Sequence, residues 1–309
     1  HSLKHFLPPP HSASMFALTP PRDLVGRYLL NVSGKEWFVR VSSRIGEAAL
    51  EQDLSTFLYT RGISVNPISY HCLTPECNGM RYRIDVRPML HGRHYNGSLK
   101  DLANLTATLR DTHKTLKDFQ SWPVVLSIAT ARYEKMDQAR LLLANALKTR
   151  AFEIFGDKAT WASQHQEWLE AMVQNYTPFL NTLPDAQCLH GEVHPGNVIF
   201  LNDSKAILVD FEESVHTFAP PSWDLSFLVQ RFCLQDNPTP ETIRERLKII
   251  SLTYEMELPQ LAQVMRQISW FSMSVIIDLV VNHSISTPQS EYDKFVSLER
   301  QANLLIGLI

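Results

Sequence analysis

Residues 188–197 read CLHGEVHPGN, and the spacing of their polar residues fits two different kinds of site. The choice between these two sites also determines which fold the sequence predicts. His190 and His194 stand four residues apart with Glu192 between them, which suggests a zinc site on a helix. A zinc pair at this spacing needs a continuous helix, since only the helical period brings both side chains onto one face. Pro195 disfavours helical geometry at His194. The local sequence therefore argues against zinc.

The same stretch has the spacing of a phosphotransfer loop. Glu192 and Asn197 lie five residues apart, and Asp210 ends the apolar run AILVD thirteen residues after Asn197. Kinases use a catalytic acid, an asparagine and a strand-end aspartate in this order. Carboxylate and amide oxygens suit Mg²⁺, which is a hard cation. The spacing predicts that Glu192 is the catalytic carboxylate and that Asn197 and Asp210 are metal ligands.

The first third of the chain has the pattern of a small sheet with one helix. Apolar runs bounded by turn residues predict two β-hairpins. Their strands are GRYLLNV (26–32) with EWFVRV (36–41), and ISYHCL (68–73) with MRYRIDVRPML (80–90). Between the hairpins, EAALEQDLSTFLYTRG (47–62) has apolar residues at helical spacing and ends on a glycine.

From residue 98 onward the pattern is mainly helical. Helices are predicted at 98–119, 130–155 and 159–179, with Ser98 as the cap of the first. After the loop, VIFL (198–201) and AILVDF (206–211) predict a short hairpin. The remainder from about residue 222 is predicted to be mostly helical.

The motifs together resemble a known superfamily. HGEVHPGN followed by VDFEES (209–214) is similar to the signature pair of the aminoglycoside phosphotransferase/choline kinase superfamily, and LTATLRDTHKTL (105–116) and PSWDLSFLVQRF (221–232) resemble its flanking segments. The resemblance implies an α+β, two-lobed protein-kinase-like fold. We expect an N-lobe at 1–91, with a small antiparallel sheet and one helix, and a larger, mostly helical C-lobe at 92–309.

The resemblance also implies residues that bind the nucleotide. Arg40 falls at the position of the basic residue that contacts the phosphates of ATP, and Glu51 at that of the helix glutamate that pairs with it. A carboxylate partner would stabilise and orient such a cation. The backbone of Asp85, Val86 and Arg87 is expected to form the hinge that hydrogen-bonds adenine.

Some positions depart from the superfamily or leave an alternative. The superfamily normally has aspartate where Glu192 stands, and often lysine where Arg40 stands. Glu47, one helical turn earlier, could take the role of Glu51. The phosphate-covering loop is expected near residues 12–26, which lack a GxGxxG pattern. Asp224 is expected to brace the catalytic loop rather than to touch substrate.

Composition narrows the class of partner. The net charge of −3 gives no reason to expect nucleic acid or an anionic membrane as a partner. The segment ISWFSMSVIIDLVV (268–281) is too short to span a bilayer, contains Asp278, and is predicted to be a buried helix. Four cysteines without a CxxC pair favour a reducing, cytoplasmic compartment.

The predicted function is ATP-dependent transfer of the γ-phosphate, with Mg²⁺, to a hydroxyl of a small molecule such as an amino sugar, amino alcohol or aminoglycoside. The alternative is a pseudokinase that binds nucleotide, or a kinase-fold protein that modifies proteins, acting in either case on a protein partner. The substitution at position 192 keeps this alternative open.

Overall fold

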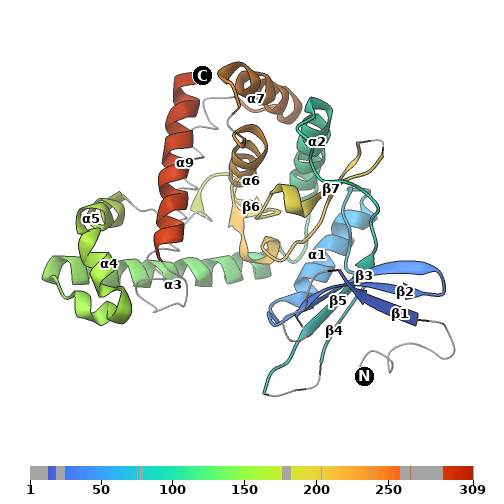
Figure 1. Cartoon of the computed structure of the whole chain (residues 1–309), viewed down its shortest axis with the longest axis horizontal. Helices are drawn as coiled ribbons and strands as arrows, with labels where there is room; N and C mark the ends of the chain where they lie inside the picture. Colours follow the sequence, from blue (N-terminus) through green and yellow to red (C-terminus); the bar gives the residue numbers. More distant parts are fainter. Residues whose placement is uncertain are drawn as a thin grey trace. The chain divides into compact units, whose positions relative to one another are not determined.

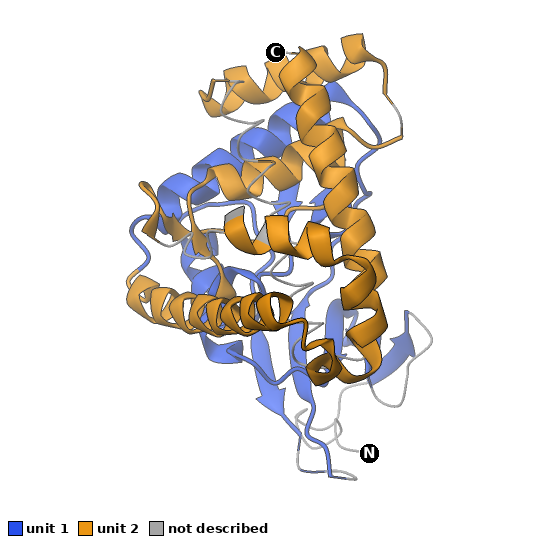
Figure 2. Ribbon diagram, turned by 90° about the vertical axis from the view of Figure 1, so that its left-hand side faces the viewer, with its two compact units in different colours: residues 1–119, 195–215 blue, residues 120–194, 216–309 orange. Residues whose placement is uncertain are grey.

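The computed structural model describes residues 13–18, 25–74, 76, 79–175, 182–202, 204–236, 238–257, 265 and 288–308. The chain forms two compact units, coloured separately in Figure 2. Unit 1 comprises residues 1–119 and 195–215, and unit 2 comprises residues 120–194 and 216–309. This partition differs from the lobes expected from the sequence, because the first long helix and the hairpin after residue 195 group with the sheet. The lobe boundary at residue 91 stays a prediction.

Unit 1 is built on a five-stranded antiparallel sheet (Figure 1). The strands lie in the order β1-β2-β3-β5-β4. Their bounds are β1 Ala13–Ala17, β2 Gly26–Val32, β3 Lys35–Ser42, β4 Tyr70–Leu73 and β5 Arg83–Pro88. Both predicted hairpins are confirmed, and β1 is a strand that the sequence pattern did not indicate. All five β1 residues are exposed, so the alternation that marks a half-buried strand is missing there.

The two faces of this sheet differ in chemistry. Val39, opposite Val86, and Val41, opposite Ile84, belong to an apolar cluster on one face. Side chains alternate along a strand, so Arg40 projects from the opposite face. The register places Asp85 directly opposite Arg40, and Arg83 and Arg87 share that face through the same alternation. One face of the sheet thus builds a core, and the other carries charged groups.

Two helices and a short hairpin complete unit 1. Helix α1 (Ala48–Thr60) packs against β4 and buries Leu54 and Leu58. Helix α2 (Leu99–Leu116) begins at Ser98, whose hydroxyl accepts a hydrogen bond from the N–H of Asp101 and confirms the predicted cap. Helix α2 contacts β8 (Ala206–Leu208), which pairs with β7 (Val198–Phe200) as predicted.

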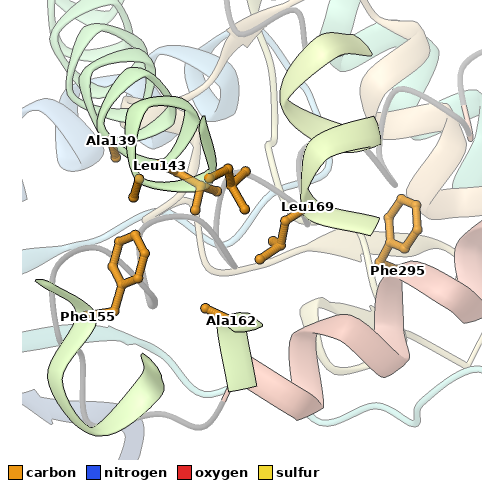
Figure 3. Close-up of a cluster of buried hydrophobic side chains, with 8 residues drawn as sticks. Ala139, Leu143, Phe155, Ala162, Leu169 and Phe295 are labelled. Carbon is orange, nitrogen blue, oxygen red and sulfur yellow. The ribbon is translucent and has the colours of Figure 1, made fainter. Parts of the chain in front are cut away.

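Unit 2 is mostly helical in its described parts. Its helices are α3 Trp122–Thr149, α4 Ala159–Gln164, α5 Gln166–Asn175, α6 Ser222–Leu228, α7 Pro240–Tyr254 and α9 Pro288–Leu308, with a 3-10 segment at Phe152–Lys158 and a π-helical turn at Val229–Cys233. A two-stranded ladder pairs β6 (Gln187–Cys188) with β9 (Phe218–Ala219). Figure 3 shows apolar side chains of α3, α4, α5 and α9 converging in one core, among them Leu143, Leu169 and Phe295.

The predicted helices of this region exist with different bounds. Helix α3 begins at Trp122 rather than at 130, because Pro123 is tolerated in the first turn of a helix. It ends where Arg150 adopts a left-handed conformation with φ 57°. The helix expected at 159–179 is divided at His165 into α4 and α5. The helix expected at 268–281 lies outside the described residues. Among the helices that are described, none combines the length and apolar character needed to cross a membrane.

Candidate phosphotransfer site

The β7–β8 hairpin brings two of the predicted metal ligands to one place. Val198 pairs with Leu208, and beyond this pair the N–H of Val209 donates to the carbonyl of Asn197 at 3.0 Å. Asn197, which precedes β7, and Asp210, which follows β8, therefore leave the same end of the hairpin. Asn197 is buried within a single 3-10 turn formed by Pro195–Asn197. A short ladder thus brings the backbones of Asn197 and Asp210, thirteen positions apart in the sequence, to the same end of the hairpin.

Asp210 has an unusual backbone conformation. Its φ of 62° lies in the left-handed region, which costs energy for residues other than glycine and is tolerated best by asparagine and aspartate. Such conformations persist only where the surroundings impose them, and they are common at functional sites. The hairpin therefore fixes the direction in which the chain leaves β8.

Arg40 reaches from β3 to this end of the hairpin. One Nη atom lies 2.7 Å from Oδ1 of Asp210, and the other forms an ion pair with Glu212. Burial alone would lower the pKa of Arg40, but the two carboxylates outweigh it and hold the pKa above its ordinary value. Arg40 therefore stays charged at every accessible pH. Glu212 is the second acid of the VDFEES motif, and its contact with Arg40 was not predicted from the sequence.

Glu51 lies in a separate cluster, which we call the buried charge cluster: Glu51, Arg83, Asp85 and Arg87. One oxygen of the Glu51 carboxylate accepts a hydrogen bond from Nη2 of Arg83 at 2.5 Å, and the other accepts one from Nη2 of Arg87 at 2.7 Å. Nε of Arg83 also donates to Asp85 at 2.7 Å. All four residues are buried, and their formal charges balance.

The expected ion pair between Arg40 and Glu51 is therefore wrong. Two arginines of β5 occupy both oxygens of Glu51, and Arg40 pairs with Asp210 and Glu212 instead. Glu51 makes only the smallest of the contributions that raise the pKa of Arg40. Glu47, the alternative to Glu51, precedes α1 and is exposed.

The residues expected to form the hinge, Asp85, Val86 and Arg87, lie within β5. Asp85 has strand partners on both sides, Arg40 on β3 and His71 on β4. Val86 lies between Val39 and Tyr70, and its carbonyl also accepts from the N–H of Ser69. Backbone groups of Asp85 and Val86 are thus used within the sheet, and the side chain of Arg87 is committed to Glu51. The strand continues to Pro88, and a contact between this backbone and a base stays a prediction.

The loop at residues 190–192, which the sequence predicts to be catalytic, is anchored within unit 2. Asp224, fully buried in α6, accepts hydrogen bonds from the N–H groups of His190 at 2.8 Å and Gly191 at 2.9 Å. The indole of Trp223 donates to the carbonyl of Gly191 at 3.3 Å. The predicted bracing role of Asp224 is confirmed. Glu192 follows directly and is half-buried. Its convergence with the unit 1 residues Asn197 and Asp210 stays a prediction.

His190 and the cysteines Cys188 and Cys233 are buried in unit 2. Nδ1 of His190 lies 3.4 Å from the backbone nitrogen of Glu192, so this ring contacts the loop itself. Within the described part of the chain, no group of three or more His, Cys, Asp or Glu side chains could hold a metal ion. Burial raises the pKa of Cys188 and of Cys233 to about 12, so both thiols remain protonated at neutral pH.

These features define a protein of the kinase-like class: an antiparallel sheet with one helix, a braced loop, and a hairpin that ends in an aspartate. The chain belongs to the phosphotransferase enzyme family, whose sequence model matches residues 24–255. No curated protein sequence gives a significant match.

Solved structures support the fold. An aminoglycoside phosphotransferase from Alicyclobacillus acidocaldarius is 15% identical with a TM-score of 0.51, and the match covers 94% of this chain and 91% of that chain. An ethanolamine kinase from Plasmodium vivax is 12% identical with a TM-score of 0.56, covering 100% and 87%. At such low identities the similarity concerns the fold alone, and it confirms the two-part kinase-like architecture.

Proposed function

We propose that the protein transfers the γ-phosphate of ATP to a hydroxyl group of a small molecule. The observation that carries this proposal is the meeting of Asn197, Asp210 and Arg40 at one end of the β7–β8 hairpin. Asn197 and Asp210 offer oxygen ligands and Arg40 a permanent positive charge, a combination that suits a nucleoside triphosphate accompanied by a metal ion. Family membership supports phosphotransfer as the class of reaction.

The residues at the hairpin fit magnesium by their chemistry. Asn197 and Asp210 offer amide and carboxylate oxygens, which Mg²⁺ prefers, and Mg²⁺ commonly takes few protein ligands beside phosphate and water. Magnesium held by Asn197 and Asp210 would supply positive charge against the negative charge that develops during phosphoryl transfer. Arg40 would hold further phosphate oxygens, since a guanidinium can contact them bidentately.

Glu192 is proposed as the group that orients the acceptor hydroxyl and accepts its proton. The loop that carries it is held by the Asp224 carboxylate through two backbone N–H groups. Such bracing limits the positions that Glu192 can adopt, and much of the rate enhancement in phosphoryl transfer comes from positioning. Glutamate reaches one methylene further than the aspartate usual in this superfamily, so the acceptor would lie correspondingly further from the loop.

Adenine is proposed to contact the backbone that follows Pro88. The N–H of Met89 still donates to the carbonyl of Glu36 at 3.2 Å, and beyond it the chain leaves the sheet. Asp85, Val86 and Arg87 would then support the site from within the sheet. Glu51 would act with them through the buried charge cluster.

The acceptor is proposed to be an amino sugar, an amino alcohol or a related hydroxyl compound. Relatives in fold include proteins named as an aminoglycoside phosphotransferase, an ethanolamine kinase and an aminopropanol kinase.

A cytoplasmic location is proposed as well. Cys72, Cys188 and Cys233 are free thiols, which supports a reducing compartment.

The test is ADP release from Mg²⁺–ATP across a panel of such compounds, with the product identified by the mass of one added phosphoryl group. We expect turnover with at least one acceptor and a large loss in Glu192→Gln. The alternative, a pseudokinase acting through a protein partner, draws support from Arg40, which already neutralises Asp210 and Glu212. Nucleotide binding without transfer to any acceptor, and background ATP hydrolysis equal in parent and Glu192→Gln, would favour that alternative.

A further inference from the structure

The buried charge cluster removes Glu51 from the neighbourhood of the phosphates. Each carboxylate oxygen of Glu51 already accepts from a guanidinium of β5, at 2.5 Å and 2.7 Å. The Glu51 side chain is 1% exposed. To orient Arg40, Glu51 would have to leave the buried guanidinium of Arg87 without a carboxylate and that of Arg83 with Asp85 alone, which is strongly unfavourable. The residue that positions Arg40 must therefore be another one.

Glu212 meets the requirements for that role. It binds the second Nη atom of Arg40, while Asp210 binds the first. A guanidinium is planar and presents its donors in a rigid fork, so two carboxylates on two nitrogens restrict both its position and its rotation. Glu212 also lies 3.3 Å from Arg44, but Arg44 is 75% exposed, and such exposed ion pairs contribute little.

We propose that Glu212 is the positioning residue of Arg40, in place of Glu51. Asp210 is a proposed metal ligand, so its hold on Arg40 would be shared with the metal when nucleotide binds. Glu212 would then keep the guanidinium directed at the phosphates. The inference rests on the proposed function, because it assigns Arg40 to a bound nucleotide.

The first test is a double-mutant cycle on the affinity for Mg²⁺–ATP, measured by calorimetry. Glu212→Gln should weaken binding about tenfold in the parent, as expected for a hydrogen bond to a charged group. In an Arg40→Met background the same substitution should change affinity by less than about twofold, because coupled residues are not additive. Glu213→Gln is the matched control: it removes the same charge one residue away, whereas the ion pairs of Arg40 go to Asp210 and Glu212.

Each outcome of the cycle is informative. Equal effects of Glu212→Gln in both backgrounds would overturn the inference and indicate that Glu212 acts directly, for instance on the metal. A tenfold effect of Glu213→Gln would also overturn it, because charge alone would then suffice. A parent protein that binds no nucleotide would overturn the proposed function itself, and the two failures are thus distinguishable.

A second readout needs no nucleotide. NMR of the Arg40 guanidinium should show slow rotation of its Nη groups in the parent, faster rotation in Glu212→Gln, and no change in Glu213→Gln. Rotation that is equally fast in the parent and in Glu212→Gln would contradict positioning by Glu212, whatever the nucleotide measurements gave.

Discussion

Two charge clusters of unit 1 use the same kinds of side chain for different purposes. In the buried charge cluster, the paired side chains of Glu51, Arg83 and Arg87 are exposed by 1%, 6% and 4%. Around Arg40, the side chains of Arg40 and Asp210 are exposed by 19% and 25%. The side chains of the buried charge cluster are inaccessible to a ligand, so their pairs serve to hold the fold. Partly open pairs can exchange partners with a ligand, so accessibility rather than composition separates the structural cluster from the proposed site.

The largest expected effect is on stability and comes from the buried charge cluster. Glu51→Gln should lower the free energy of unfolding by about 3–5 kcal/mol, because it leaves buried guanidinium groups without their carboxylate. Denaturant unfolding of parent and variant measures this difference. Glu47→Gln, four residues earlier and exposed, is the control and should change stability by less than about 0.5 kcal/mol. Similar small changes in both variants would show that the cluster contributes little to the fold.

The next effect is on catalysis and comes from the partly open cluster. Asp210→Asn should reduce phosphate transfer roughly a hundredfold to a thousandfold while leaving stability nearly unchanged. Asparagine tolerates the left-handed backbone of this position, so the loss would reflect the missing charge. Asp236→Asn controls for the backbone, since Asp236 has φ 63° and lies in unit 2. Transfer at near-parent rates in Asp210→Asn would exclude Asp210 from the reaction.

The smallest effect is expected at the edge of the partly open cluster. Arg44→Ala should change the affinity for Mg²⁺–ATP by less than about twofold, because ion pairs of exposed side chains are worth about 1 kcal/mol or less. Calorimetry at low and moderate salt measures this. A change of fivefold or more would mean that Arg44 contacts the nucleotide, and that exposure does not separate the two kinds of cluster.

The sequence predicted those parts of the molecule that depend on local pattern. Apolar runs bounded by turn residues predicted β3 and, between Asn197 and Asp210, the β7–β8 hairpin. The motif around Asp224 also predicted that this residue braces the loop, and its hydrogen bonds to the backbone of His190 and Gly191 confirm this.

Partner choice among charged residues could not be predicted in the same way. The pairing of Glu51 with Arg83 and Arg87 depends on strand register and on the placement of α1, neither of which leaves a local signal. Because two arginines of β5 pair with Glu51, Arg40 pairs instead with Asp210 and Glu212, which follow β8. Strand β1 escaped prediction because its residues are all exposed and show no alternation.

The most direct test of the account is a calorimetric titration of ATP, with and without Mg²⁺, into the parent protein and Asp210→Asn. We expect Mg²⁺ to strengthen ATP binding in the parent, and this strengthening to be lost in Asp210→Asn. Parent binding that is indifferent to Mg²⁺, or an equal response to Mg²⁺ in both proteins, would contradict a nucleotide–metal site at the β7–β8 hairpin.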